Sequence, residues 1–167
     1  MLFLNEYLNY SMKIVKKIGW VALGLLLIIQ FIPTEKNNGE LSSLDAFVTE
    51  TKPSQEVQKI LKNACYDCHS DKTNYPWYHS VAPINFWMNH HVEDGKKHLN
   101  FSKWAAYSLK RKEHKMEEFW EEVEEKHMPL NSYTWTHSEA KLTDEQITEV
   151  LNWAKTVQAN YEAQIQK

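Results

Sequence analysis

Both cysteines of the chain lie in one five-residue segment, Cys65-Tyr66-Asp67-Cys68-His69. A chain of 167 residues with 2 Cys cannot be stapled by a network of disulfides, so it has to bury an apolar core. Hydrophobic residues supply 43% of the sequence, which is enough for a core and too much for a disordered acidic chain. The segment also sets two thiols and an imidazole side by side, so any group that they bind must lie against it.

This spacing is typical of covalent haem attachment. The two thiols form thioether bonds with the vinyl groups at one edge of the haem, and the histidine that follows becomes an axial ligand of the iron. We therefore predict one covalent haem c, held by Cys65 and Cys68 and ligated by His69. The abundance of flat side chains, with 7 Trp, 8 Tyr and 6 Phe, fits a large flat cofactor.

Three other interpretations compete for the same segment. A thioredoxin-like dithiol uses two cysteines at this spacing, but that fold needs βαβ units, and no stretch alternates with the period of a strand. A structural zinc site needs a second pair of ligands at suitable spacing. A plain disulfide leaves His69 and the aromatic content unexplained.

The second axial ligand is predicted to be Met128, which precedes Pro129 in a loop before the last helix. A thioether opposite a histidine raises the reduction potential and suits electron transfer. A lone methionine also commonly fills a gap in a core. The rival ligands are His90, His91 and His98, which would give a bis-histidine haem. The four remaining histidines are interpreted as structural or exposed: His79, His114, His127 and His137.

Charge and glycine content exclude several classes of function. The chain has 19 Lys+Arg and 22 Asp+Glu, a formal net charge of −3, which does not favour a nucleic-acid partner. With 4 Gly, glycine-rich phosphate loops are not expected.

The amino-terminal part resembles an export segment. Lys13, Lys16 and Lys17 precede an apolar run, Ile18–Ile32, that is interrupted only by Gln30. As a helix this run is about 22 Å long, short for a bilayer core of about 30 Å, although flanking residues extend it. No small-residue cleavage site follows, so we expect an uncleaved transmembrane helix over residues 13–33 rather than a cleaved signal peptide. Because positive residues favour the cytoplasmic side, we expect residues 1–33 to form a cytoplasmic stub and a membrane anchor. The residues that follow position 33 are then expected in the periplasm.

The remainder is predicted to be all-α, with long loops. Residues 34–52 have few apolar anchors and are expected to form a linker, so the haem-binding domain is predicted over residues 53–167. Apolar spacing indicates helices from about 55 to 65, from 103 to 126 with Ser102 as N-cap, and from 143 to 158, with short turns at 85–91. The last helix begins with a capping box, Thr143 to Gln146.

Several separate motifs resemble the small bacterial haem-binding domain family, over roughly residues 50–158. The resemblance implies a haem c attached through Cys65, Cys68 and His69 in a membrane-anchored or periplasmic protein of the cytochrome c class. Met128-Pro129 followed by Leu142 and Trp153 is also similar to the ligand loop and last helix of a class I cytochrome c. The motifs that carry the resemblance to the haem-binding domain family are Cys65–His69, Tyr75-Pro76-Trp77-Tyr78, Pro83, His91, Gly95, Leu99-Asn100-Phe101-Ser102-x-Trp104, Met128-Pro129, Tyr133, His137, Ala140, Leu142 and Trp153.

Two classes of function follow. The first is an electron-transfer cytochrome, in which an acidic helix face steers a basic redox partner protein. The second is a haem peroxidase module or a sensor of small ligands, which needs an open position at the iron. The electron carrier, which is no enzyme, is favoured because no arranged acid–base constellation is visible. The acidic residues are Glu117, Glu118, Glu121, Glu122, Glu124 and Glu125.

Overall fold

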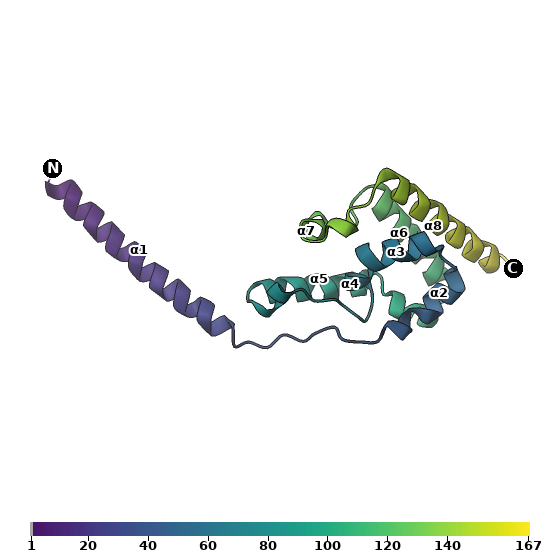
Figure 1. Cartoon of the computed structure of the whole chain (residues 1–167), viewed down its shortest axis with the longest axis horizontal. Helices are drawn as coiled ribbons and strands as arrows, with labels where there is room; N and C mark the ends of the chain where they lie inside the picture. Colours follow the sequence, from purple (N-terminus) through teal and green to yellow (C-terminus); the bar gives the residue numbers. More distant parts are fainter. Residues whose placement is uncertain (1) are drawn as a thin grey trace. The chain divides into compact units, whose positions relative to one another are not determined.

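The computed structural model describes residues 2–167, with side chains from Tyr10 onward, and the described chain is built from helices (Figure 1). Among these residues the sole β-type pairing is an isolated antiparallel bridge between Asn38 and Lys72. The predicted all-α class is therefore confirmed. The elements are α1 (Leu2–Ile29), η1 (Leu41–Leu44), α2 (Asp45–Thr51), α3 (Gln55–Ala64), α4 (Tyr66–His69), η2 (Trp77–Ser80), α5 (Ile84–His98), η3 (Phe101–Ala106), α6 (Leu109–Glu124), α7 (Asn131–Thr134), η4 (Ser138–Ala140) and α8 (Asp144–Ile165).

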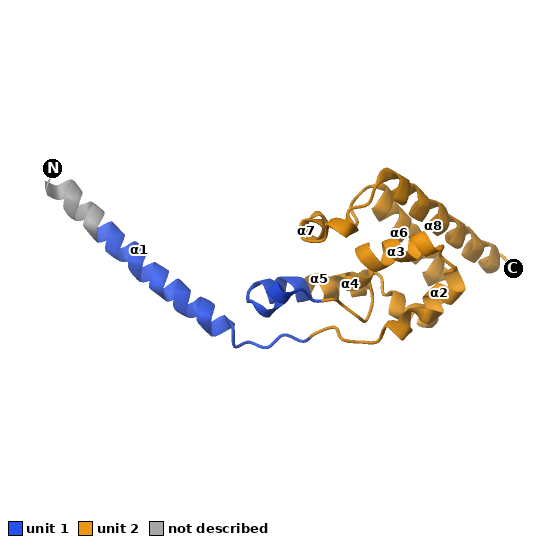
Figure 2. Ribbon diagram, in the orientation of Figure 1, with its two compact units in different colours: residues 1–35, 75–89 blue, residues 36–74, 90–167 orange. Residues whose placement is uncertain are grey.

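The chain divides into two compact units (Figure 2). The first combines residues up to Glu35 with Tyr75–Asn89, and the second combines Lys36–Asn74 with His90–Lys167. The boundary falls inside α5, whose first residues belong to the first unit and whose last residues belong to the second.

In the first unit, the end of α1 is hydrogen-bonded to the segment before α5. The Gln30 side-chain Nε2 donates to the Ala82 carbonyl (3.0 Å), and the Gln30 side-chain Oε1 accepts from the Ala82 N–H (2.9 Å). Asn89 donates from its side chain to the Glu35 carbonyl (2.8 Å). Residues far apart in the sequence are thereby joined at this end of α1.

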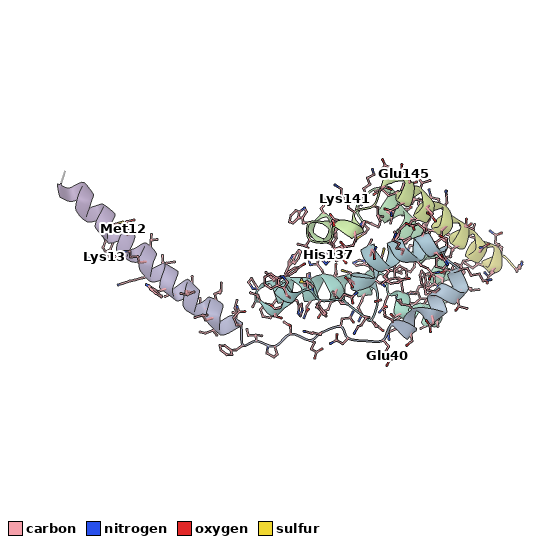
Figure 3. All side chains as sticks on the ribbon, in the orientation of Figure 1. Met12, Lys13, Glu40, His137, Lys141 and Glu145 are labelled. Atoms are coloured by element: carbon pink, nitrogen blue, oxygen red, sulfur yellow. The ribbon has the colours of Figure 1, made fainter. Side chains whose placement is uncertain are left out.

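The expected transmembrane helix over residues 13–33 is not found. None of the helices in the described part of the chain is both long enough and apolar enough to cross a membrane. The reason lies in where α1 ends: it stops at Ile29, before the apolar run does, and its last 18 residues include Lys13, Lys16 and Lys17. Lys13 projects from α1 in Figure 3.

The second unit has a core of aromatic and aliphatic side chains. Helix α6 packs along α8 and buries Met116, Phe119 and Val123 against that helix. Phe47 lies at the centre of the aromatic group, with its ring centroid 4.5 Å from that of Phe101 and 5.0 Å from that of Trp104. This core supports the segments that carry the cysteine–histidine motif.

The expected linker at residues 34–52 differs from the structure in its second half. Residues 41–51 form η1 and α2, and they bury Leu44 and Phe47 in the core. The composition of the segment did not reveal this, because it has few apolar residues. The two that matter, Leu44 and Phe47, pack against residues that are distant in the sequence.

Side-chain caps begin the helices α3, α6 and α8. Ser54 caps α3, and the capping box of Thr143 and Gln146 at the start of α8 is confirmed. Ser102, predicted as an N-cap, lies inside η3, whose cap is Asn100, and α6 begins later, after Ser108. The turns expected at 85–91 are part of a longer helix, α5.

Candidate functional site

The cysteine–histidine motif lines a cavity of about 510 Å³ in the second unit. This volume is within the usual range for small-molecule and cofactor sites, about 300–1,000 Å³. Residues from α3 to α6, from the segment after α6 and from α8 contribute to its walls. The lining includes Cys65, Cys68, His69, His90, His91, Asp94, Gly95, His98, Leu99, Lys115, Glu118, Phe119, Glu122, Met128, Pro129, Leu130 and Tyr133.

The imidazole of His69 is fixed by a backbone carbonyl. Its Nδ1 lies 3.0 Å from the Leu99 oxygen. Because a carbonyl can only accept, Nδ1 carries the proton and Nε2 keeps its lone pair. Burial lowers the pKa of His69, which favours the neutral ring despite the carbonyl bond. The histidine is thus prepared to ligate a metal through Nε2.

The two thiols are protonated and available. Neither cysteine forms a disulfide, and both lie in the described part of the chain. Burial raises the pKa of Cys65 to about 12 and that of Cys68 to about 11; the neighbouring Cys68 adds to the first shift and the Asp67 carboxylate adds to the second. Redox-active dithiols rely on a lowered thiol pKa, so these thiols do not have the environment of a thioredoxin-like site.

Helix α5 approaches the motif through Gly95. A Cβ atom on Gly95 would lie 2.8 Å from the Cys68 carbonyl oxygen and 3.1 Å from the Cys68 Cβ. Real Cβ atoms do not sit this close to backbone, so only glycine lets α5 pack here. The close approach places Leu99, at the end of α5, where its carbonyl reaches His69.

A network around Asp71 holds the segment that offers this carbonyl. The Asp71 carboxylate accepts from Asn100 Nδ2 (2.9 Å), and the ammonium groups of Lys96 and Lys103 lie 3.0 and 3.2 Å away. Burial alone would raise the pKa of Asp71, but these donors outweigh it and lower the pKa to about 2. Asp71 therefore holds the chain at Lys96, before Leu99, and at Asn100 and Lys103, after it.

A second network joins the motif to the loop after Met128. Tyr133 donates its hydroxyl to Asp67 Oδ2 (2.8 Å), while Asp67 Oδ1 accepts from the Asn74 N–H (2.9 Å). Burial and the Asp67 carboxylate raise the pKa of Tyr133, so its hydroxyl stays a donor. The ring of His137, labelled in Figure 3, stacks on Tyr133 with centroids 4.1 Å apart.

Met128 and the three rival histidines all line the same cavity. Met128 is half-buried and packs on the core, and its N–H donates to the Glu122 carbonyl (3.0 Å). His91 is half-buried as well, whereas His90 and His98 are exposed. The structure brings the candidate ligands together, and the choice of Met128 stays a prediction.

The other four histidines lie outside the residues that line the cavity. His79 is buried and contacts Asn89 Oδ1 through Nε2 (2.9 Å). His114 and His127 are exposed and face glutamates of α6 and its end. Their interpretation as structural or exposed agrees with these positions.

Sequence reasoning missed three contributors. The roles of Leu99, Gly95 and Tyr133 were not anticipated, although all three belong to the motifs quoted above. A glycine inside a helix is a signal of close backbone approach and could have identified Gly95. A backbone acceptor such as the Leu99 carbonyl leaves no signal in the side-chain pattern.

The residues present fit a haem. The cavity offers two free thiols, a neutral histidine with a fixed ring, and mostly apolar walls. Among the described residues, no three His, Cys, Asp or Glu side chains are grouped so that they could hold a metal ion between them. His69 would hold iron together with a group that brings its own ligands, which is the arrangement of a haem protein.

Comparison with known proteins agrees with this site. The model of the haem-binding domain family matches residues 24–156, more than half of the chain, and this span contains the motif and all the residues that line the cavity. No curated protein and no solved structure matched the chain. The chain belongs to the haem-binding domain family and is a haem-binding protein.

Proposed function

We propose that this protein is a c-type cytochrome that carries electrons with one covalently attached haem. The observation that carries the proposal is that two free thiols and a histidine, whose ring is hydrogen-bonded to a backbone carbonyl, line the same cavity. Cys65 and Cys68 would hold the haem edge, and His69 would ligate the iron through Nε2. When bound, the haem supplies one-electron exchange at its iron.

Four residues of the cavity would have defined tasks in such a carrier. The Leu99 carbonyl keeps the His69 ring in one orientation and increases its strength as a ligand. Phe119, Val123 and Leu142 contribute apolar wall, which limits the access of water. A helical cytochrome c-like arrangement is part of this proposal.

We propose Met128 as the second axial ligand. Its support is its position in the cavity wall, half-buried and attached by its N–H to the end of α6. His91 is the rival that shares its depth, since His90 and His98 are exposed.

The redox partner is proposed to be a basic protein. Glu118 and Glu122 line the cavity, one turn apart on α6, and further glutamates extend from them along the same helix. Negative charge beside a redox site steers a positive partner toward it and raises the rate of encounter.

The domain is proposed to act outside the cytoplasm, in the periplasm and at the cytoplasmic membrane. The support is chemical: thioether attachment of haem takes place in that compartment, and residues 13–33 have the lysine-then-apolar order of an export segment. Cell fractionation, with mass spectrometry of the mature chain in each fraction, tests this. A chain that is matured with haem yet retained in the cytoplasm would contradict it.

Maturation in cells that contain a cytochrome c assembly system tests the covalent haem. We expect the haem to remain with the denatured chain after acid–organic extraction. The double variant Cys65→Ala/Cys68→Ala should lose all of it. Haem that stays with the denatured double variant would refute covalent attachment. Rapid carbon monoxide binding by the intact protein would instead favour the second function, a peroxidase module or small-ligand sensor.

A further inference from the structure

We propose that the segment of residues 75–89, which we name the aromatic loop, rests on the surface of a lipid bilayer beside the end of α1. This inference rests on the proposed membrane location, and it assigns a second, separate contact to that location. The loop belongs to the same compact unit as α1 (Figure 2).

The aromatic loop exposes large apolar side chains. Trp77 is 82% exposed and Trp87 is 49% exposed, and Val81 and Ile84 are exposed between them. Tryptophan combines a large apolar ring with one N–H donor, so it is enriched where hydrocarbon meets water. An exposed cluster of this kind marks an interaction surface.

The loop carries no full charge. From Tyr75 to Val92 the sequence contains no Asp, Glu, Lys or Arg, although charged residues make up 25% of the chain. Moving a charge out of water is costly, so a segment that enters the headgroup region benefits from having none.

Hydrogen bonds attach the loop to α1. The two bonds between Gln30 and Ala82 and the bond from Asn89 to Glu35 hold the loop at the carboxyl end of the helix. Whatever surface covers the end of α1 therefore lies next to the loop as well.

The exposure pattern of α1 favours lipid as this surface. Leu25, Leu26, Leu27 and Ile28 are each 47–64% exposed, and four successive positions at about 100° per residue face almost every direction around the axis. A protein groove or a second copy of the chain covers one face of a helix. Lipid chains can cover all faces of this carboxyl-terminal part of α1 without the whole helix crossing the bilayer, so a bilayer is the occupant that we propose.

Quenching by brominated lipid tests the proposal on the full haem-loaded chain. Vesicles of phosphatidylcholine with dibrominated acyl chains should quench part of the tryptophan fluorescence. In Trp77→Phe/Trp87→Phe this quenched part should fall, because two of the residues near the hydrocarbon no longer emit. The matched control is Trp135→Phe, which removes an 81% exposed tryptophan of the second unit and should leave the quenched part intact.

Affinity for the same vesicles gives a second measurement. Trp77→Ala/Trp87→Ala should weaken binding about tenfold, a loss of about 1.4 kcal/mol, and Trp135→Ala should change it less than twofold. Binding through α1 with an unchanged quenched part would overturn the proposal while leaving the membrane location in place. No vesicle binding at all would refute both, and the haem spectrum would then report separately on the cytochrome. Loss of a lipid-free dimer in Trp77→Ala/Trp87→Ala would show a second copy as the occupant and also overturn it.

Discussion

The two walls of the candidate haem cavity are held in different ways. The motif wall, residues 65–71 with 95–104, has Phe101 and Trp104 fully buried, a glycine contact with Cys68, and four polar anchors at Asp71 and His69. The methionine wall, residues 128–137, contains α7, whose residues are all described and none of which is buried. The bond from Tyr133 to Asp67 ties it to the motif. The difference teaches that the proposed ligand His69 is positioned by the core, whereas the proposed ligand Met128 is positioned by a surface loop.

The largest effect is expected for Met128→Ala, which tests whether the methionine wall supplies a ligand to the iron. We expect the weak thioether band of the ferric spectrum to disappear, the iron to open to carbon monoxide and the potential to fall, because thioether ligation raises it. His91→Ala is the control and should leave the band in place. An unchanged spectrum for Met128→Ala with an altered one for His91→Ala would establish a bis-histidine haem instead.

The rigidity of the motif wall is tested by Gly95→Ala. The added Cβ would collide with the Cys68 carbonyl, so α5 or α4 must shift, and we expect the free energy of unfolding to fall by about 1–3 kcal/mol, with lower haem content. Gly24→Ala is the matched control, a helical glycine whose Cβ would meet no described atom within 4 Å. Thermal unfolding of both variants measures this loss. Equal stability of the two variants would show that the motif wall can shift to accommodate the added Cβ.

The hydrogen bond that joins the methionine wall to Asp67 of the motif is tested by Tyr133→Phe, with the smallest expected effect. Losing a hydrogen bond to a carboxylate should lower the free energy of unfolding by about 1–2 kcal/mol. It should also broaden the thioether band that we assign to Met128 in the ferric spectrum. A double-mutant cycle with Asp67→Asn isolates the pair. Additive effects in that cycle would mean that the two walls are not coupled through this bond.

Features that depend on neighbours in sequence could be predicted. The capping box at Thr143 and the Ser54 cap form from residues within one turn, and the helical class follows from apolar spacing. The joint position of Cys65, Cys68 and His69 also follows from their adjacency. The covalent haem and the location inferred from them remain predictions.

Features that depend on distant neighbours could not be predicted. The side-chain pattern did not indicate the acceptor of His69, which is the Leu99 carbonyl, because α5 approaches α4 at Gly95. Phe47 appeared to lie in a linker, yet it is buried against Phe101 and Trp104.

The sequence by itself determined that this chain is helical and carries two thiols and a histidine together. Only the tertiary structure decided which carbonyl orients that histidine. It also decided that Met128 and His91 line the same cavity as the histidine. The physical reason is that a side chain's type and its immediate spacing are local properties. The partner that it meets across a core depends on the packing of segments that are far apart in the chain.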